Sequence, residues 1–343
     1  MLDDLKLIHE KDPQDALGIA EKQHEQLLHT FDVPHIDMHP ENVVVAGMGG
    51  SAFGALISMS WPGYKLPFEI VRNYDIPAYV SEKTLFVASS YSGTTEETIT
   101  ALEQAAAKGA RIVVIASGGK LEEIATAKGY PFAKLPIVGQ PRFAVLVALK
   151  ALLSLLAAAG VVSMSELQPQ LEAAASSLQE AVKAWRPDVP TSQNQAKQIA
   201  QEVMGKSAVV YSGPKMYPAA YKWKIDFNEN AKNVAWVNQY PEFNHNEFIG
   251  WSKQPVDKPY AVIDLRSNLE HERVQKRFGV SERLLSGMRP SPIVVTIEGK
   301  TLLEQLVWAI ALGDFVSVYL ALLNNVNPSP VPLVESFKVE LNK

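Results

Sequence analysis

The chain of 343 residues is long enough for two domains with a large buried core. Its net charge of −5 argues against a nucleic-acid-binding surface, and its 47% hydrophobic and 20% charged residues are typical of a soluble globular protein. The absence of cysteine excludes disulfides, thiolate nucleophiles and zinc–thiolate sites.

Residues 1–40 are predicted to form helix and loop ahead of the first strand. The segment starts acidic and lacks the cationic and apolar regions of a signal peptide, so we expect a cytoplasmic protein. His35, Asp37 and His39 alternate near its end. A solvated loop is the usual structure of such a cluster, and we predict neither a metal site nor a cofactor.

Short apolar runs and helical patterns alternate after residue 40. The predicted strands cover residues 42–47, 67–74, 84–90 and 111–117, and the predicted helices cover 51–60, 95–109 and 120–129. Such alternation predicts an α/β fold with a parallel sheet covered by helices on both faces. Thr94 and Glu97 fit a capping box, and Gly109 fits the end of the same helix.

The apolar run 143–160 could be mistaken for a membrane span. Its length is borderline and Lys150 lies at its centre, so we predict a buried core helix and no membrane association.

The same order of segments recurs in the second half of the chain. The parallel pairs are 42–57 with 207–229, 84–93 with 259–268, 110–125 with 291–306, and 142–157 with 308–323. This order predicts a duplication into domains 41–185 and 196–343, joined by the polar linker 186–195. The first copy keeps Gly and Ser in its turns, so we expect one phosphate cradle per chain, in the first half.

The stretch "GMGGSAFGA", residues 47–55, joins a strand directly to a helix. Gly49, Gly50 and Ser51 would form an anion cradle there, because unpaired N–H groups at a helix start point toward a ligand. The spacing matches neither the P-loop nor the dinucleotide fingerprint, and a simple tight turn is the alternative.

A second polar loop, "SSYSGTTEET" at 89–98, again leaves a strand and enters a helix. Ser90, Ser92, Thr94 and Thr95 surround Gly93 with hydroxyl groups that suit a phosphate dianion. Taken alone, the loop could be a helix cap with surplus serines. Two such loops at the carboxyl ends of strands in one sheet favour a phosphate ligand. No nearby lysine or acid is placed for magnesium, which disfavours a nucleotide.

The motifs "GMGGSAFG", "SSYSGTTEET", "GQPR", "NENAK" and "EFNHNE" occur in the order seen in the bifunctional phosphoglucose/phosphomannose isomerases, which the chain resembles from about residue 40 to its C-terminus. The resemblance implies two sugar isomerase (SIS) domains, each a parallel sheet flanked by helices in three αβα layers. It also implies a homodimer with composite active sites. Thr94 stands where the family pattern has asparagine and keeps a hydrogen-bonding side chain.

Aldose–ketose isomerisation needs a base over two adjacent carbons, a cation near the enediolate oxygen and an acid that assists ring opening. The resemblance assigns the base to Glu229, the cation to Arg142 and ring opening to His245. It makes Lys338 a candidate contact of the sugar ring oxygen or a hydroxyl.

The residues leave alternatives to these roles. Glu242 and Glu247 are rival carboxylates in the same polar block, and all three acids could be surface residues with His245 in a loop. Trp223, Trp236 and Trp251 are expected in core or interface packing.

The predicted function is an isomerase that binds a hexose 6-phosphate between its halves and converts glucose 6-phosphate, and mannose 6-phosphate, to fructose 6-phosphate through an enediolate. The predicted phosphate-binding residues are Gly49, Gly50, Ser51, Ser90, Ser92 and Thr95. The alternatives are a non-catalytic sugar-phosphate sensor with the same fold and an isomerase that acts on an amino-sugar phosphate.

Overall fold

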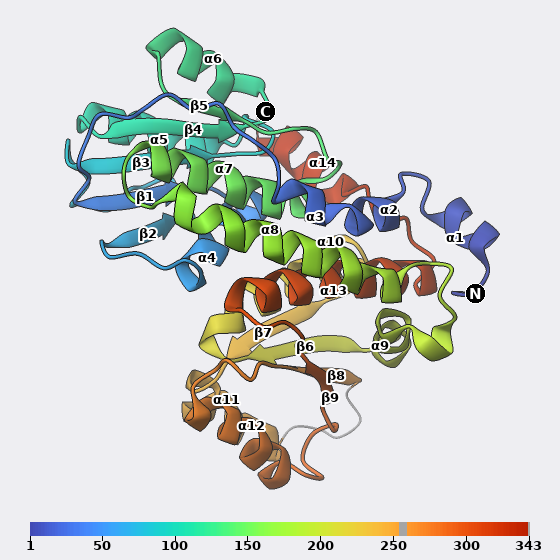
Figure 1. Ribbon diagram of the computed structural model, residues 1–343. Coiled ribbons are helices and arrows are strands. Elements are labelled where there is room, and N and C mark those ends of the chain that lie inside the picture. The colour runs from blue at the N-terminus through green and yellow to red at the C-terminus, as the bar shows by residue number, and fades with distance from the viewer. Residues whose placement is uncertain (254–258, 342–343) are drawn as a thin grey trace. The chain divides into compact units, whose positions relative to one another are not determined.

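The computed structural model describes residues 1–253 and 259–341 and is shown in Figure 1. The chain divides into two compact units. The first-sheet unit comprises Lys22–Gln179 and Leu302–Val307, and the second-sheet unit comprises Met1–Glu21, Glu180–Thr301 and Trp308–Lys343. The predicted linker 186–195 lies within the second-sheet unit, and the predicted domain boundaries stay a prediction.

The sheet of the first-sheet unit is parallel throughout. Its strands are β1 (Asn42–Ala46), β2 (Phe68–Val71), β3 (Thr84–Ser89), β4 (Arg111–Ala116) and β5 (Phe132–Lys134), in the order β2-β1-β3-β4-β5. The predicted strands are confirmed, although the second is shorter than expected. β5 was not predicted, because a strand of three residues is too short to show a periodic pattern.

Helices cover both faces of this sheet (Figure 1). The helices of this unit are α3 (Gln23–Gln26), α4 (Phe53–Ser60), α5 (Glu96–Ala107), α6 (Gly119–Lys128), α7 (Val145–Ala158) and α8 (Met164–Ala181), of which α7 lies on one face of the sheet and α5 and α6 lie on the other. Val43 and Val45 pack in one core cluster with α7, whereas Val44 and Ala46 pack in another with α5 and α6. Alternate side chains of a strand point to opposite faces, so a continuous apolar run is the sequence of a strand buried on both sides.

The capping-box prediction at α5 is wrong. The N-cap is Thr95, and its side chain makes no capping hydrogen bond. Its Oγ1 lies instead 2.8 Å from Ser90 Oγ, because this hydroxyl belongs to the polar loop rather than to the helix end. Gly109 does follow the C-terminal end of α5, with a positive φ of 78° that glycine adopts at little cost.

The second-sheet unit repeats the strand order of the first. Its strands are β6 (Ser207–Ser212), β7 (Ala235–Gln239), β8 (Tyr260–Arg266) and β9 (Ile293–Thr296), in the parallel order β7-β6-β8-β9. Its helices include α1 (Leu5–Lys11), α2 (Ala16–Glu21), α9 (Gln195–Val203), α10 (Tyr217–Glu229), α11 (Glu247–Gly250), α12 (Glu272–Leu284) and α14 (Pro332–Leu341). The shared order supports the predicted duplication.

The two copies differ after the fourth strand. The segment 301–306 was expected to match the separate helix α6, but it belongs to the long helix α13 (Leu302–Leu323), which continues through 308–323. Gly313 lies in this helix where an added Cβ would come within 2.4 Å of the Trp223 ring. The glycine therefore permits the close approach of α13 and the indole, whose Nε1 donates to Ala309 O at 2.7 Å.

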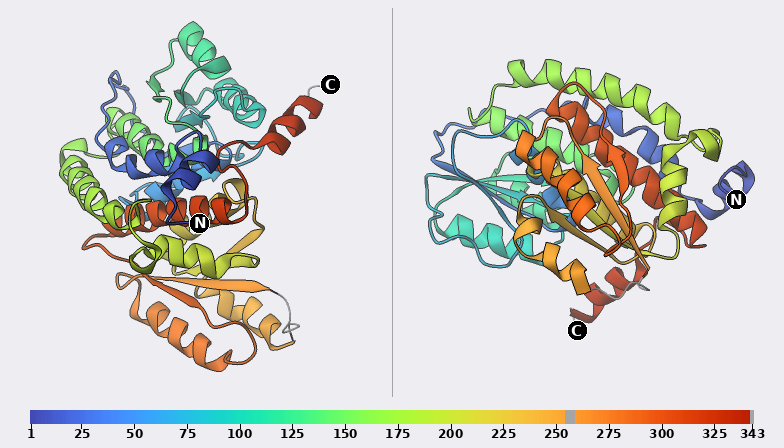
Figure 2. Two further views of the ribbon diagram at one scale, coloured as in Figure 1. Left: turned by 90° about the vertical axis from the view of Figure 1, so that its right-hand side faces the viewer. Right: turned by 90° about the horizontal axis from the view of Figure 1, so that it is seen from below.

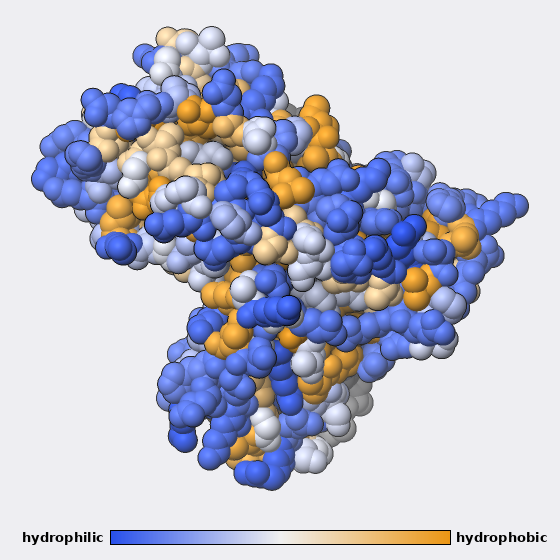
Figure 3. Space-filling view, in the orientation of Figure 1, coloured by the Kyte–Doolittle hydropathy of each residue, from blue (hydrophilic) through white to orange (hydrophobic). Residues whose placement is uncertain are grey.

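Two apolar helices are buried rather than exposed. α7 confirms the predicted core helix, and Lys150 at its centre is 3% exposed and donates to Gln168 on α8. Among the described residues, α13 is long and apolar enough to cross a membrane, but 94% of its apolar window is buried within the protein. The face seen in Figure 3 is largely hydrophilic, with small apolar patches between charged residues.

Candidate functional site

The two predicted phosphate loops lie side by side at the carboxyl ends of β1 and β3. The backbone N–H of Tyr91 donates to Ser51 Oγ at 2.8 Å, and Ser89 Oγ donates to Ser51 O at 2.9 Å. β1 and β3 are neighbours in the sheet, so residues about forty positions apart meet at one edge. Ser51 therefore ties the glycine turn to the serine loop.

Hydroxyl pairs shape the serine loop. Ser90 is 1% exposed, and its Oγ also accepts from Gly93 N at 3.1 Å, so it holds the turn together. Ser92 Oγ and Thr94 Oγ1 are exposed and lie 3.0 Å apart. Buried hydroxyls thus support the loop, while exposed hydroxyls and the N-terminus of α5 are open to a ligand.

A third loop, Ser117–Gly119, packs beneath the serine loop and was not singled out from the sequence. Gly93 has a φ of 70°, and an added Cβ there would lie 1.7 Å from Gly118 O. Ser117 Oγ donates to Tyr91 O at 2.5 Å. The adjacent glycines Gly118 and Gly119, just after β4, are the sequence feature from which this loop could be predicted.

Arg142 lies against the glycine turn. It belongs to a short 3₁₀ helix, Pro141–Phe143, which starts with proline at a first helical position as predicted. A Cβ added at Gly50 would come within 2.9 Å of Pro141 C and O and 3.1 Å of Arg142 N. Arg142 is 1% exposed, and its guanidinium group packs over the Phe143 ring, 5.3 Å from the ring centroid, so a buried arginine follows the residue that lies against the glycine turn.

Glu229 is the last residue of α10 in the second-sheet unit. It is half-buried and lines a pocket of about 490 Å³ together with Lys232, Val234 and the segment 331–334 at the start of α14. The carboxylate is therefore beside a cavity with a mainly apolar wall.

A buried ionic network lies one to two turns before Glu229 on α10. Lys222 Nζ is 2.5 Å from Asp226 Oδ1 and 2.6 Å from Asp314 Oδ1, and all three side chains are fully buried. Burial by itself lowers the pKa of Lys222, but the two carboxylates outweigh it and hold the pKa above its usual range. The sequence did not signal this network, because Lys and Asp are usually surface residues.

His245 ends a short 3₁₀ helix, Glu242–His245, and its side chain is exposed. Two residues of α12 form hydrogen bonds with the neighbouring Asn244. Asn244 Nδ2 donates to Ser281 Oγ at 2.9 Å, and Arg277 Nη1 donates to Asn244 Oδ1 at 3.1 Å. His245 thus extends to the surface from an anchored turn.

The two rival carboxylates have other contacts. Glu247 accepts hydrogen bonds from the Tyr211 hydroxyl and from Asn238 Nδ2, the latter at 2.8 Å. Glu242 accepts from Asn246 Nδ2. Glu247 also lines a pocket of about 400 Å³ together with Trp236 and Tyr260. Glu229 and Glu247 therefore both border pockets.

Lys338 lies on α14, the helix nearest the C-terminus in Figure 2. All described residues of this helix are exposed. The same helix contributes its first turn to the pocket beside Glu229.

Among the tryptophans, Trp223 and Trp251 are buried as expected, whereas Trp236 is 50% exposed.

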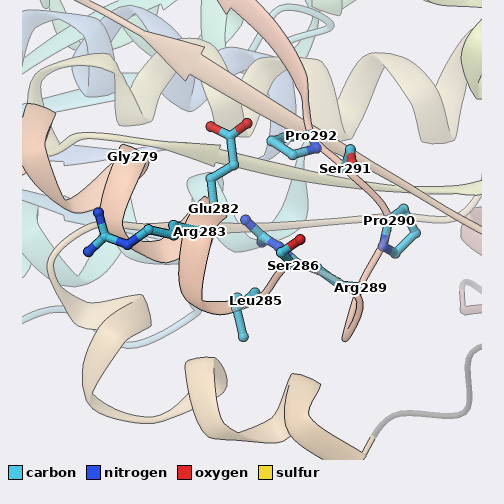
Figure 4. A pocket seen from close by; sticks show the side chains of 9 residues that line it. All are labelled: Gly279, Glu282, Arg283, Leu285, Ser286, Arg289, Pro290, Ser291 and Pro292. Atoms are coloured by element: carbon cyan, nitrogen blue, oxygen red, sulfur yellow. The ribbon is translucent and has the colours of Figure 1, made fainter.

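A second pocket, of about 410 Å³, contains none of the predicted site residues (Figure 4). Its lining includes Arg283, Ser286 and Arg289, and the Arg289 guanidinium also packs over Tyr211 and Phe243. Within the described ranges, no three His, Asp or Glu side chains are gathered as metal ligands, and His35, Asp37 and His39 form no such group.

Both halves of the chain match known protein families. The SIS domain model matches residues 39–159, and the model for the bacterial phospho-glucose isomerase C-terminal SIS domain matches residues 192–341. The chain is 34% identical over 306 residues to a bifunctional phosphoglucose/phosphomannose isomerase of Caldicellulosiruptor bescii, covering 88% of this chain and 89% of the relative.

Two further similarities concern related proteins. A D-glucosamine-6-phosphate 4-epimerase of Sulfolobus acidocaldarius is 32% identical over 234 residues, which covers 68% of this chain and 71% of the relative. The crystal structure of a glucose-6-phosphate isomerase like protein from Thermus thermophilus superposes with a TM-score of 0.65 at 20% identity, covering 98% of each chain. The latter similarity concerns the fold.

Proposed function

Because the chain belongs to the family of bifunctional phosphoglucose/phosphomannose isomerases, which are aldose–ketose isomerases, we propose that it interconverts glucose 6-phosphate and mannose 6-phosphate with fructose 6-phosphate. Both aldoses lead to one enediolate, so a single base serves both reactions if the C2–C3 bond can rotate. The observation that carries the proposal is the joined pair of phosphate loops with the buried Arg142 beside them.

The phosphate group is held in this proposal by Gly49, Gly50, Ser51, Ser90, Ser92 and Thr95. Gly50 carries no side chain, so the backbone can approach both the ligand and Arg142 closely. The N-terminus of α5 adds a positive field from its aligned peptide dipoles. Neutral donors therefore bind a dianion without a metal ion or a cofactor.

Proton transfer is assigned to Glu229. The carboxylate accepts the proton from one carbon and returns it to the adjacent carbon, while the Arg142 guanidinium stabilises the negative charge on the enediolate oxygen. His245 assists ring opening, and Lys338 contacts the ring oxygen or a hydroxyl. The apolar wall beside Glu229 would help to exclude water from the transferred proton.

An assay with three substrates tests the function. A coupled assay with glucose, mannose and glucosamine 6-phosphates should show turnover of the first two and none of the third. Turnover of glucosamine 6-phosphate alone would favour the amino-sugar alternative, to which the 32% identity with the glucosamine-6-phosphate epimerase lends weight. Binding of all three without turnover would favour the sugar-phosphate sensor.

Replacing Ser92 or Thr95 by alanine is expected mainly to raise KM. The loop holds the phosphate equally in ground and transition states, so its loss weakens binding while kcat changes little. Initial rates over a range of glucose 6-phosphate concentrations measure both constants. Ser165→Ala, at an exposed serine in the same unit, is the control, and an unchanged KM in both loop variants would contradict the cradle.

We also propose that the protein is a cytoplasmic homodimer in which His245 serves the partner's site. The exposed side chain on an anchored turn supports this arrangement. Mixed dimers of Glu229→Gln and His245→Ala chains are then expected to regain activity, because one site in each mixed dimer keeps both residues. If each chain served its own site, every site in the mixed dimer would be defective and activity would stay low.

A further inference from the structure

The second sheet has its own counterpart of the phosphate cradle. Gly213–Met216 joins β6 to α10, just as Gly47–Ala52 joins β1 to α4. β6 and β1 hold the same place in the two strand orders, next to β8 and β3 respectively. The loop 267–271 after β8 is therefore the counterpart of the serine loop 90–95 after β3.

A carboxylate of the chain occupies this second cradle. Glu270 is 5% exposed, and its Oε1 accepts hydrogen bonds from the backbone N–H groups of Lys215 at 2.8 Å and Met216 at 3.1 Å. A Cβ added at Gly213 would lie 2.3 Å from Glu270 Cδ. The side chain thus fills the space that the glycine leaves open.

The electrostatic setting is that of an anion site. Lys215 and Met216 lie in the 3₁₀ turn Pro214–Met216, which leads directly into the 13-residue helix α10. The N–H groups at the start of a helix carry partial positive charge. Burial raises the pKa of Glu270, while the two N–H groups oppose that rise by binding the charged form. The carboxylate supplies the oxygen acceptor that a phosphate oxygen would supply in the first cradle.

We propose that Glu270 is a built-in anion that closes the second cradle, so that each chain binds phosphate only at the first. The inference rests on the proposed phosphate binding at residues 49–51 and 90–95. The two cradles differ in the loop that follows the neighbouring strand: hydroxyl groups surround Gly93 in the first, whereas Glu270 reaches back to the glycine turn in the second. The carboxylate both fills the space and repels a second dianion.

Calorimetric titration with inorganic phosphate tests the proposal on the full-length chain. The wild-type protein should bind one phosphate per chain, and Glu270→Ala should bind two, because the variant vacates the second cradle. Glu270→Gln should bind one, since the amide still fills the space. Glu272→Ala removes the same charge from an exposed position two residues away and should also bind one.

Thermal unfolding gives a second measurement, also with Glu270→Ser in case Glu270→Ala folds poorly. Tm is compared between phosphate, at concentrations that saturate the first site, and chloride at equal ionic strength. Phosphate should raise the Tm of Glu270→Ala and Glu270→Ser by about 2–4 °C more than it raises the Tm of Glu270→Gln. One phosphate per chain in Glu270→Ala, with no added rise in Tm, would overturn the inference. Absence of phosphate binding in the wild-type protein would instead overturn the proposed first cradle.

Discussion

Replacing Glu229 by glutamine is expected to lower kcat by at least ~10²–10⁴-fold with little change in KM. Glutamine keeps the shape of the side chain but cannot accept the proton that moves between C1 and C2. The pocket beside Glu229 should remain, so substrate binding is retained. Exchange of the C2 proton with deuterated solvent, measured alongside turnover, should fall in parallel.

Two matched variants show whether the base is correctly assigned. Glu242→Gln and Glu247→Gln change carboxylates that already accept hydrogen bonds from Asn246, and from Tyr211 and Asn238. If Glu229→Gln kept full exchange and Glu242→Gln or Glu247→Gln lost it, the base would be the carboxylate whose replacement abolished exchange. His245→Ala should be partly rescued by an open-chain analogue, because ring opening is then unnecessary, whereas Glu229→Gln should not.

Replacing Lys222 by methionine is expected to destabilise the protein by about 3–5 kcal/mol. Asp226 and Asp314 would face each other in the core without the ammonium group that lies 2.5 and 2.6 Å from them. The midpoint of urea unfolding measures the loss. Lys224→Met, at a half-buried position on the same helix, should change the free energy of unfolding by less than about 0.5 kcal/mol.

The triple variant Lys222→Met, Asp226→Leu, Asp314→Leu tests the physical cause. If the cost in Lys222→Met comes from uncompensated buried charge, removing both carboxylates as well should recover most of the stability. The pKa of Lys222 is raised in the folded protein, so its stabilising contribution is present below the usual pKa and is lost as pH rises through the higher folded value. The difference in free energy of unfolding between wild type and Lys222→Met should therefore become smaller in strong alkali. A difference that stayed constant would argue against the ionic origin.

The sequence by itself determined the α/β class, the positions of most strands of the first sheet and the two polar loops that we propose to bind phosphate. These features are local: a buried parallel strand is a short apolar run, and its end is marked by Gly, Ser or Thr within a few residues. The resemblance to one isomerase family then named Glu229, His245, Arg142 and Lys338, which neither periodicity nor spacing could do.

Only the tertiary structure decided which polar groups meet. Thr95 rather than Thr94 is the N-cap residue of α5, and its hydroxyl pairs with Ser90 instead of capping the helix. Gly50 is required because the backbone of Pro141 lies against it. Lys222 and Glu270 look like surface residues until α13 and the β6–α10 turn supply their partners. Such contacts join segments far apart in the chain, and their free energy depends on burial and geometry that no local pattern records.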